Sequence, residues 1–168
     1  MTFQIHALNP EPFQRFRHMT QRELAQHHAS WVVADERPGF PCRVSLADAK
    51  VGTRLLLINY EHHPHRSPYR ARHAVYIDLD ARQATPAPGV VPKSIASRMI
   101  ASRAFDQNGH LCRAELCPGE TLPPVLEALL GEERVRYIHL HNAAPGCFAA
   151  RVTRSSQNDS EAAPWALS

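Results

Sequence analysis

Several features that mark common classes of protein are missing from this sequence of 168 residues. Its apolar runs are short, such as LLLI at residues 55–58, whereas a membrane-spanning helix needs about 20 apolar residues. The opening residues, MTFQIHALNP, lack the basic and apolar segments of a signal peptide. The net charge is only +3 with histidine neutral, and the arginines are scattered. We therefore expect a cytoplasmic protein that binds neither membrane nor nucleic acid.

Motifs for several kinds of chemistry are also absent. The four cysteines include no C-x-x-C pair, which argues against a zinc ribbon and a thioredoxin-type site. No G-x-S-x-G motif and no Gly-rich phosphate loop occurs. Without an export signal, we expect the cysteines to be free thiols. What the sequence has in excess is 11 histidines and 14 prolines.

The pattern of apolar residues predicts one α+β domain over residues 1–154, with a mostly antiparallel sheet and two or three short helices. Residues 54–60 form an almost continuous apolar run, typical of a central strand that is covered on both faces. Residues 155–168 are polar and aperiodic, and we expect them to be a mobile tail.

Three local signals predict where helices and turns lie. Thr20 and Glu23 have the spacing of a capping box at the start of a helix. Pro92 suits the first turn of a helix that would carry Ile95, Met99 and Ile100 on one face, and leucines at 122, 126, 129 and 130 predict a clear amphipathic helix. Asn108-Gly109 supplies the turn of a hairpin, with strands at 102–105 and 111–116.

A pair of histidines lies on the predicted strand YIHLHN. Because side chains alternate across a strand, Ile138 and Leu140 share one face, and Tyr137, His139 and His141 share the other. We expect the histidine face to point to a cleft, a subunit contact or water. An H-x-H pair on a strand can bind a metal ion if a third ligand comes from elsewhere. The candidates for this ligand are Glu61, His62, His65, His73, Cys42 and Cys147, and among them we choose His62. Two alternatives stay open: half-exposed histidines on a solvated face, or histidines that bind or protonate a substrate without metal.

The segment EHHPHRSPYRARH at 61–73 is the second dense set of polar residues. It follows the central strand directly, and loops at strand ends commonly carry binding groups. Tyr69 and Arg70 are candidates for holding an anion. We expect His63 and His65 to be solvated. His73 has the strand parity of the apolar residues after it, which indicates a packed core histidine.

Two cysteines are candidate nucleophiles. Cys147 follows a Pro-Gly turn at the start of a strand, and Cys42 precedes Arg43, whose positive charge favours a thiolate. His62, His139 or His141 is the candidate base for either thiol. The competing interpretation is that both cysteines are buried and structural.

Five blocks of the sequence resemble a known family: FPCRVSLADAKVG, LLLINYEH, SPYR, RAFDQNG and YIHLHNAAPGCFAAR. They are similar to a small bacterial family that is catalogued as domain of unknown function 1203. The resemblance runs from the N-terminus to about Arg154 and implies a single stand-alone bacterial domain, but no reaction. The matching polar or turn positions are Cys42, Arg43, Asn59, Tyr60, Glu61, His62, Tyr69, Arg70, His139, His141, Asn142, Gly146, Cys147 and Arg151.

These observations predict a small enzyme or ligand-binding protein with one pocket lined by histidine, cysteine and arginine. The predicted metal ligands are His62, His139 and His141, and a divalent metal such as zinc is the cofactor we consider. The candidate catalytic residues are His62, Glu61, Cys147 and Cys42. The candidate substrate-binding residues are Arg43, Tyr69, Arg70, Asn142 and Arg151, for a small anionic molecule. The alternatives are a metal-free cysteine enzyme and a non-enzymatic module that forms a homo-oligomer through its histidine face.

Overall fold

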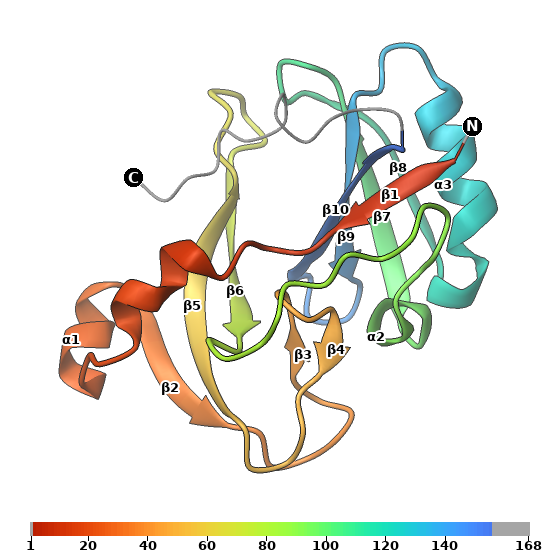
Figure 1. The fold of residues 1–168 in the computed structure, drawn as a ribbon. Helices are drawn as coiled ribbons and strands as arrows, with labels where there is room; N and C mark the ends of the chain where they lie inside the picture. Colours follow the sequence, from red (N-terminus) through yellow and green to blue (C-terminus); the bar gives the residue numbers. More distant parts are fainter. Residues whose placement is uncertain (1, 156–168) are drawn as a thin grey trace.

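The computed structural model describes residues 2–155, which form two five-stranded sheets (Figure 1). The first sheet contains, in spatial order, β1 (Phe3–His6), β10 (Phe148–Arg154), β9 (Tyr137–Asn142), β7 (Met99–Phe105) and β8 (Leu111–Pro118). The second contains β2 (Ala29–Val33), β5 (Arg54–His63), β6 (Ala71–Ile77), β3 (Pro41–Cys42) and β4 (Ala47–Asp48). Neighbouring strands are antiparallel except for β3 and β6. With 38% strand and 19% helix, the predicted α+β class is confirmed.

The helical elements are short: η1 (Glu11–Phe16), α1 (Gln21–Gln26), α2 (Lys93–Ala96), η2 (Gly119–Thr121) and α3 (Leu122–Gly131). Helix α1 begins as the sequence predicts. The Thr20 hydroxyl accepts from the Glu23 amide, and the Glu23 carboxylate accepts from the Thr20 amide, so the capping box is complete. None of the helices within residues 2–155 is long and apolar enough to cross a membrane.

Helix α3 covers one face of the first sheet (Figure 1). Its leucines, including Leu126, pack in one apolar cluster with Ile138 and Leu140 of β9 and with residues of β1, β7 and β10. The other face of β9 carries Tyr137, His139 and His141, and these side chains contact the second sheet. The histidines therefore lie between the two sheets.

The second sheet presents alternate residues of β5 to this same interior. Ile58 and Tyr60 pack with Phe13 of η1 and with residues of α1, and Phe148 from the first sheet joins that cluster. His62 follows on the same face, and its ring lies 4.8 Å from that of Phe148. The contact between the sheets is thus made by aromatic and imidazole rings.

Two local predictions differ from the structure, and a third is not tested by it. Strand β5 does not end at Tyr60 but runs through His63, and its pairing with β6 shifts register between Glu61 and His63. This bulge places one extra residue in β5, so the successive side chains of His62 and His63 are both buried. The helix that begins after Pro92 ends at Ala96, because the following residues pair with β8 and β9 as strand β7. The predicted tail lies, from residue 156 onward, outside the described residues.

Candidate functional site

Three buried histidines meet where β5 contacts β9. His62 comes from β5, His139 and His141 come from β9, and the three are 4%, 2% and 1% exposed. One ring nitrogen of each lies within 4.8 Å of the corresponding nitrogens of the other two. The centroid of the His62 ring is 5.2 Å from each of the other two centroids. The H-x-H pair and the third histidine selected from the sequence are therefore neighbours in space.

The expectation that the histidine face of β9 points to a cleft, a subunit contact or water is wrong. Every residue of β9 is buried, because α3 covers one face of the first sheet and the second sheet covers the other. Alternation predicted correctly which residues share a face. It carried no information about what lies against that face.

The hydrogen bond of His141 fixes which ring nitrogen carries the proton. Its Nδ1 lies 3.0 Å from the carbonyl oxygen of Gly146, and a carbonyl can only accept, so Nδ1 is the donor. In the neutral ring, Nε2 then holds the lone pair. This Nε2 is buried and has no hydrogen-bond partner within the described residues. A buried, unpaired lone pair whose opposite nitrogen donates to a carbonyl is the usual state of a metal-binding histidine.

His62 is linked to two other histidines. Its Nδ1 lies 3.3 Å from Nδ1 of His139, and its Nε2 lies 2.7 Å from Nδ1 of His73 on β6. The His62 ring is nearly parallel to the rings of His73 and Phe148, with interplanar angles of 14° and 11°. These contacts hold the orientation of the His62 imidazole. His73, predicted from its strand parity to be a packed histidine, is half-buried beside the three.

Burial keeps these imidazoles neutral. Burial is the main cause, and together with the neighbouring histidines and Arg103 it lowers the pKa of His62 to about 2 and that of His141 to about 3. Burial also holds the pKa of His139 well below the ordinary value. Neutral imidazole is the form that binds metal ions, so the cluster needs to lose no proton to do so at neutral pH.

A small cavity of about 30 Å³ adjoins the cluster. His62 and His139 form part of its wall, together with His6, Tyr60 and Arg151. The Arg151 guanidinium also lies over the ring of Tyr137, 4.4 Å from its centroid. A space of this size holds about one water molecule.

A second, larger cavity of about 630 Å³ is lined by a different set of the predicted site residues. Arg43, Asn142 and Cys147 line it, together with His73. The residues expected to line one pocket therefore line two separate cavities, and Arg151 is in the wall of the small one. His73 connects them, since it lines the large cavity and contacts His62 of the small one.

Four predicted residues lie away from the histidines. Glu61 accepts a hydrogen bond from Nε of Arg70 at 2.7 Å, and both belong to the hairpin of β5 and β6. Tyr69 is 43% exposed at the same hairpin. Cys42 is buried in the apolar cluster around Ile58, where its Sγ accepts from the backbone amide of Asp78.

His63 was missed as a buried residue, and its predicted solvation is wrong. It is 0% exposed, and its Nε2 lies 2.9 Å from the hydroxyl of Tyr137. His65 is half-buried, and its ring lies 5.2 Å from that of His63. The sequence predicted that His63 lies in a solvated loop after the strand, and a β-bulge has no distinctive sequence signal here that would have placed it in the strand with a buried side chain.

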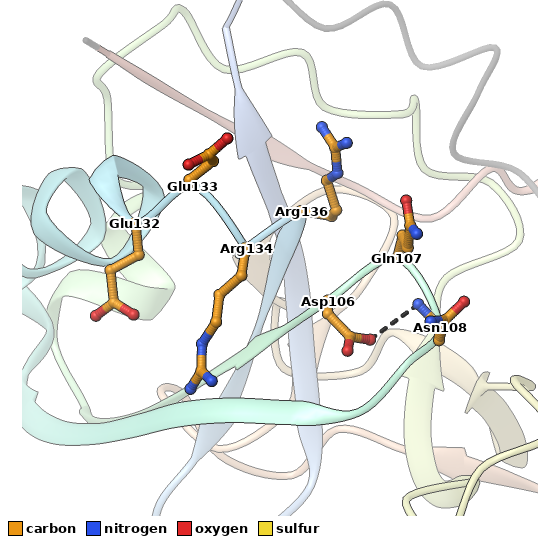
Figure 2. Close-up of a pocket in the computed structure, with 7 residues that line it drawn as sticks. All are labelled: Asp106, Gln107, Asn108, Glu132, Glu133, Arg134 and Arg136. Atoms are coloured by element: carbon orange, nitrogen blue, oxygen red, sulfur yellow. Dashed lines mark hydrogen bonds between the residues drawn. The ribbon is translucent and has the colours of Figure 1, made fainter.

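A third, open depression of about 760 Å³ lies between the turn joining β7 to β8 and the segment before β9 (Figure 2). Charged side chains of both signs line it, including Asp106, Glu133 and Arg134. Asp106 accepts from the backbone amides of Asn108 and His110, as part of the turn itself. None of the predicted site residues lies here.

A family model described as "Protein of unknown function (DUF1203)" matches residues 39–154. The matched segment contains the three clustered histidines and all residues of the large cavity. Neither the curated proteins nor the solved structures contain a match.

Proposed function

Because the chain belongs to the DUF1203 family, whose function is unknown, the site is the guide to function, and we propose that the protein binds a divalent transition metal ion through His62, His139 and His141. Two observations carry this proposal: Nε2 of His141 is buried without a hydrogen-bond partner within the described residues, and one ring nitrogen of each of the three histidines lies within 4.8 Å of those of the other two. A buried polar atom without a partner destabilises a fold unless something pairs with it.

The separations are close to those of a metal site. Tetrahedral zinc with Zn–N distances of about 2.0–2.1 Å places two nitrogen ligands about 3.3 Å apart. The Nδ1 atoms of His62 and His139 are 3.3 Å apart. The widest separation, up to 4.8 Å, would have to shorten by about 1.5 Å for all three nitrogens to bind one ion.

The surrounding hydrogen bonds support metal binding. When Nδ1 of His62 gives its lone pair to a metal, Nε2 carries the proton and donates it to Nδ1 of His73. His141 already donates its opposite nitrogen to Gly146. Two of the three ligands thus have the outer hydrogen bond that orients metal-bound histidines.

The ligand set indicates both the kind of metal and what it does. Three imidazoles without a carboxylate suit zinc, copper, iron or nickel, and leave the ion its full positive charge. Three protein ligands with an open fourth position are typical of catalytic rather than structural zinc. The cavity of about 30 Å³ lies beside His62 and His139, and Arg151 in its wall favours an anion. Zinc bound by these residues would lower the pKa of a bound water to about 7 and would so supply a nucleophile.

Metal loading of purified protein tests the proposal. Protein is stripped with a chelator, incubated with zinc, iron or copper, desalted and analysed for metal by mass spectrometry. We expect about one ion per chain for the wild type and for the control H18A/H27A, which removes two exposed histidines. We expect almost none for H139A/H141A. Equal metal content in H139A/H141A and the control would contradict the proposal.

A second measurement guards against a variant that does not fold. Cobalt(II) in a tetrahedral nitrogen site has intense visible absorption, so it is added to stripped wild-type protein alone. We expect such bands together with a rise in the thermal midpoint, because the ion binds only the folded chain. A wild type with neither response does not bind metal at this cluster, whatever the variants do.

A further inference from the structure

The cavity of about 630 Å³ has the size and lining of a small-molecule site. Its wall is mostly apolar, with Leu57, Tyr76, Met99 and Pro145 among the lining residues. None of the described side chains that line it is acidic. A neutral or anionic organic molecule fits this lining better than a cation does.

Cys147 is the nucleophilic side chain in that wall. It follows Gly146, which has φ of 70° and closes the turn between β9 and β10 by donating from its amide to the Asn142 carbonyl. The thiol is half-buried. Two N–H groups point at its sulfur, since Nη2 of Arg43 lies at 3.0 Å and Nδ2 of Asn142 at 3.5 Å.

The partners of Arg43 make this contact electrostatically distinctive. Arg43 is 2% exposed, its Nε donates to the Phe148 carbonyl at 2.8 Å, and its Nη1 donates to the Pro41 carbonyl. Both carbonyls are neutral, and no carboxylate within residues 2–155 pairs with this guanidinium. Burial lowers the pKa of Arg43, and Cys147 opposes that effect. A buried cation needs a compensating charge, and the sulfur can supply it as thiolate.

We propose that Cys147 is a nucleophile, held as thiolate by Arg43 and Asn142, and that the cavity binds a small, largely apolar electrophile. The electron pair of the thiolate forms a bond from Sγ to an electrophilic carbon. The electron pair of the bond between that carbon and its leaving group departs with the leaving group, as an anion. The sulfur thereby becomes a neutral thioether, and no oxidant or reductant takes part.

This site is separate from the proposed metal centre. The sulfur contacts Arg43 and Asn142, and it lies in the large cavity rather than the small one. Experiments on metal-free protein therefore test the thiol proposal whether or not the metal proposal holds.

Competitive alkylation tests the reactivity. Stripped native protein is treated briefly with chloroacetamide at pH 7, and the extent of labelling at each cysteine is read by peptide mass spectrometry. Cys117 is the matched internal control, because it is also half-buried. Cys112 is half-buried too, but burial raises the pKa of its thiol, so it serves as a slow reference. We expect Cys147 to react at least tenfold faster than either, as thiolate rather than thiol is the nucleophile. Labelling of Cys147 no faster than that of Cys117 overturns the proposal.

Two further arms test the causes. N-benzyl chloroacetamide carries the same reactive carbon with an apolar group. We expect its rate of labelling to saturate with increasing reagent concentration at Cys147 but not at Cys112. A labelling rate that rises linearly with reagent concentration at both cysteines would contradict binding in the cavity. In R43M we expect the ratio of Cys147 to Cys112 labelling to fall about tenfold, and in R43K to fall less. An unchanged ratio of Cys147 to Cys112 labelling in folded R43M would show that Arg43 does not activate the thiol. The experiment with N-benzyl chloroacetamide uses wild-type protein, so it does not depend on whether a variant folds.

Discussion

Among single residues, His73 offers a test of how the proposed metal ligands are held. H73F keeps an aromatic ring beside His62 but removes the acceptor for its Nε2, which lies at 2.7 Å. Loss of such an outer hydrogen bond typically weakens metal binding about 10–100-fold. We expect H73F to bind zinc weaker by that factor in competition with a chromophoric chelator, and H73N, which retains an acceptor, to lose less. Wild-type affinity in H73F would show that this hydrogen bond does not matter.

Residues were predictable where the chemistry follows from local spacing. Strand alternation correctly predicted that His139 and His141 share one face of β9. The structure adds that His62 lies next to both. The predicted solvation of His63 was wrong because the bulge in β5 turns its side chain inward. Arg43 was expected to hold a substrate anion, yet its guanidinium donates to two carbonyls and a sulfur, partners that no local pattern reveals.

Among the elements, α3 supports the site from the opposite face of β9. Leu126 is 0% exposed and packs in the cluster that contains Ile138 and Leu140. Truncating a fully buried leucine typically costs about 2–5 kcal/mol. We expect L126A to lower the free energy of unfolding by that amount in urea titrations. The control V125A removes a half-buried side chain one position earlier and is expected to cost clearly less. Equal losses would mean that α3 does not pack as described.

The contrast between α3 and the segment after Pro92 shows what limits prediction of elements. The leucines of α3 repeat at helical spacing, and that repeat is contained within the helix itself. Met99 and Ile100 also fit a helical face, but these residues hydrogen-bond to β8 and β9 as part of β7. Pairing with strands distant in sequence outweighed a weak local helical preference.

For the whole molecule, the neutral buried histidines predict loss of stability in acid. The pKa of His62 is about 2 and that of His141 about 3 in the fold, lowered mainly by burial, against an ordinary 6.5. Below pH 6.5 the unfolded chain therefore binds more protons than the folded chain. Each such histidine removes up to about 1.4 kcal/mol of stability per pH unit as the pH falls toward its folded pKa.

Urea unfolding of metal-free protein at pH 7.5, 6 and 5 measures this effect. We expect the free energy of unfolding to be steady above pH 7 and to fall steeply below pH 6. The variant H62F lacks one buried imidazole and is expected to fall less steeply. Equal stability of the wild type at pH 5 and pH 7.5 would contradict neutral burial of the histidines.

The arrangement of the strands in three dimensions was harder to predict from the sequence than single residues or single elements. The sequence indicated most strands, the antiparallel class and α3. It could not indicate that ten strands divide into two sheets, since that division depends on which strands pair across long separations. The stacking of Phe148 on His62 joins the sheets, and those two residues are 86 positions apart. For the same reason, the separation of one expected pocket into two cavities could be seen only in three dimensions.

The turn at residues 143–146 has a consequence for how this protein tolerates insertions and deletions. His141 lies before this turn and Cys147 follows it. The Gly146 amide closes the turn by donating to the Asn142 carbonyl, and the Gly146 carbonyl orients His141. Adding or removing one amino acid here would disturb an imidazole and a thiol together. Length variation among relatives should accordingly be found in connections such as 80–91, while this four-residue connection keeps its length.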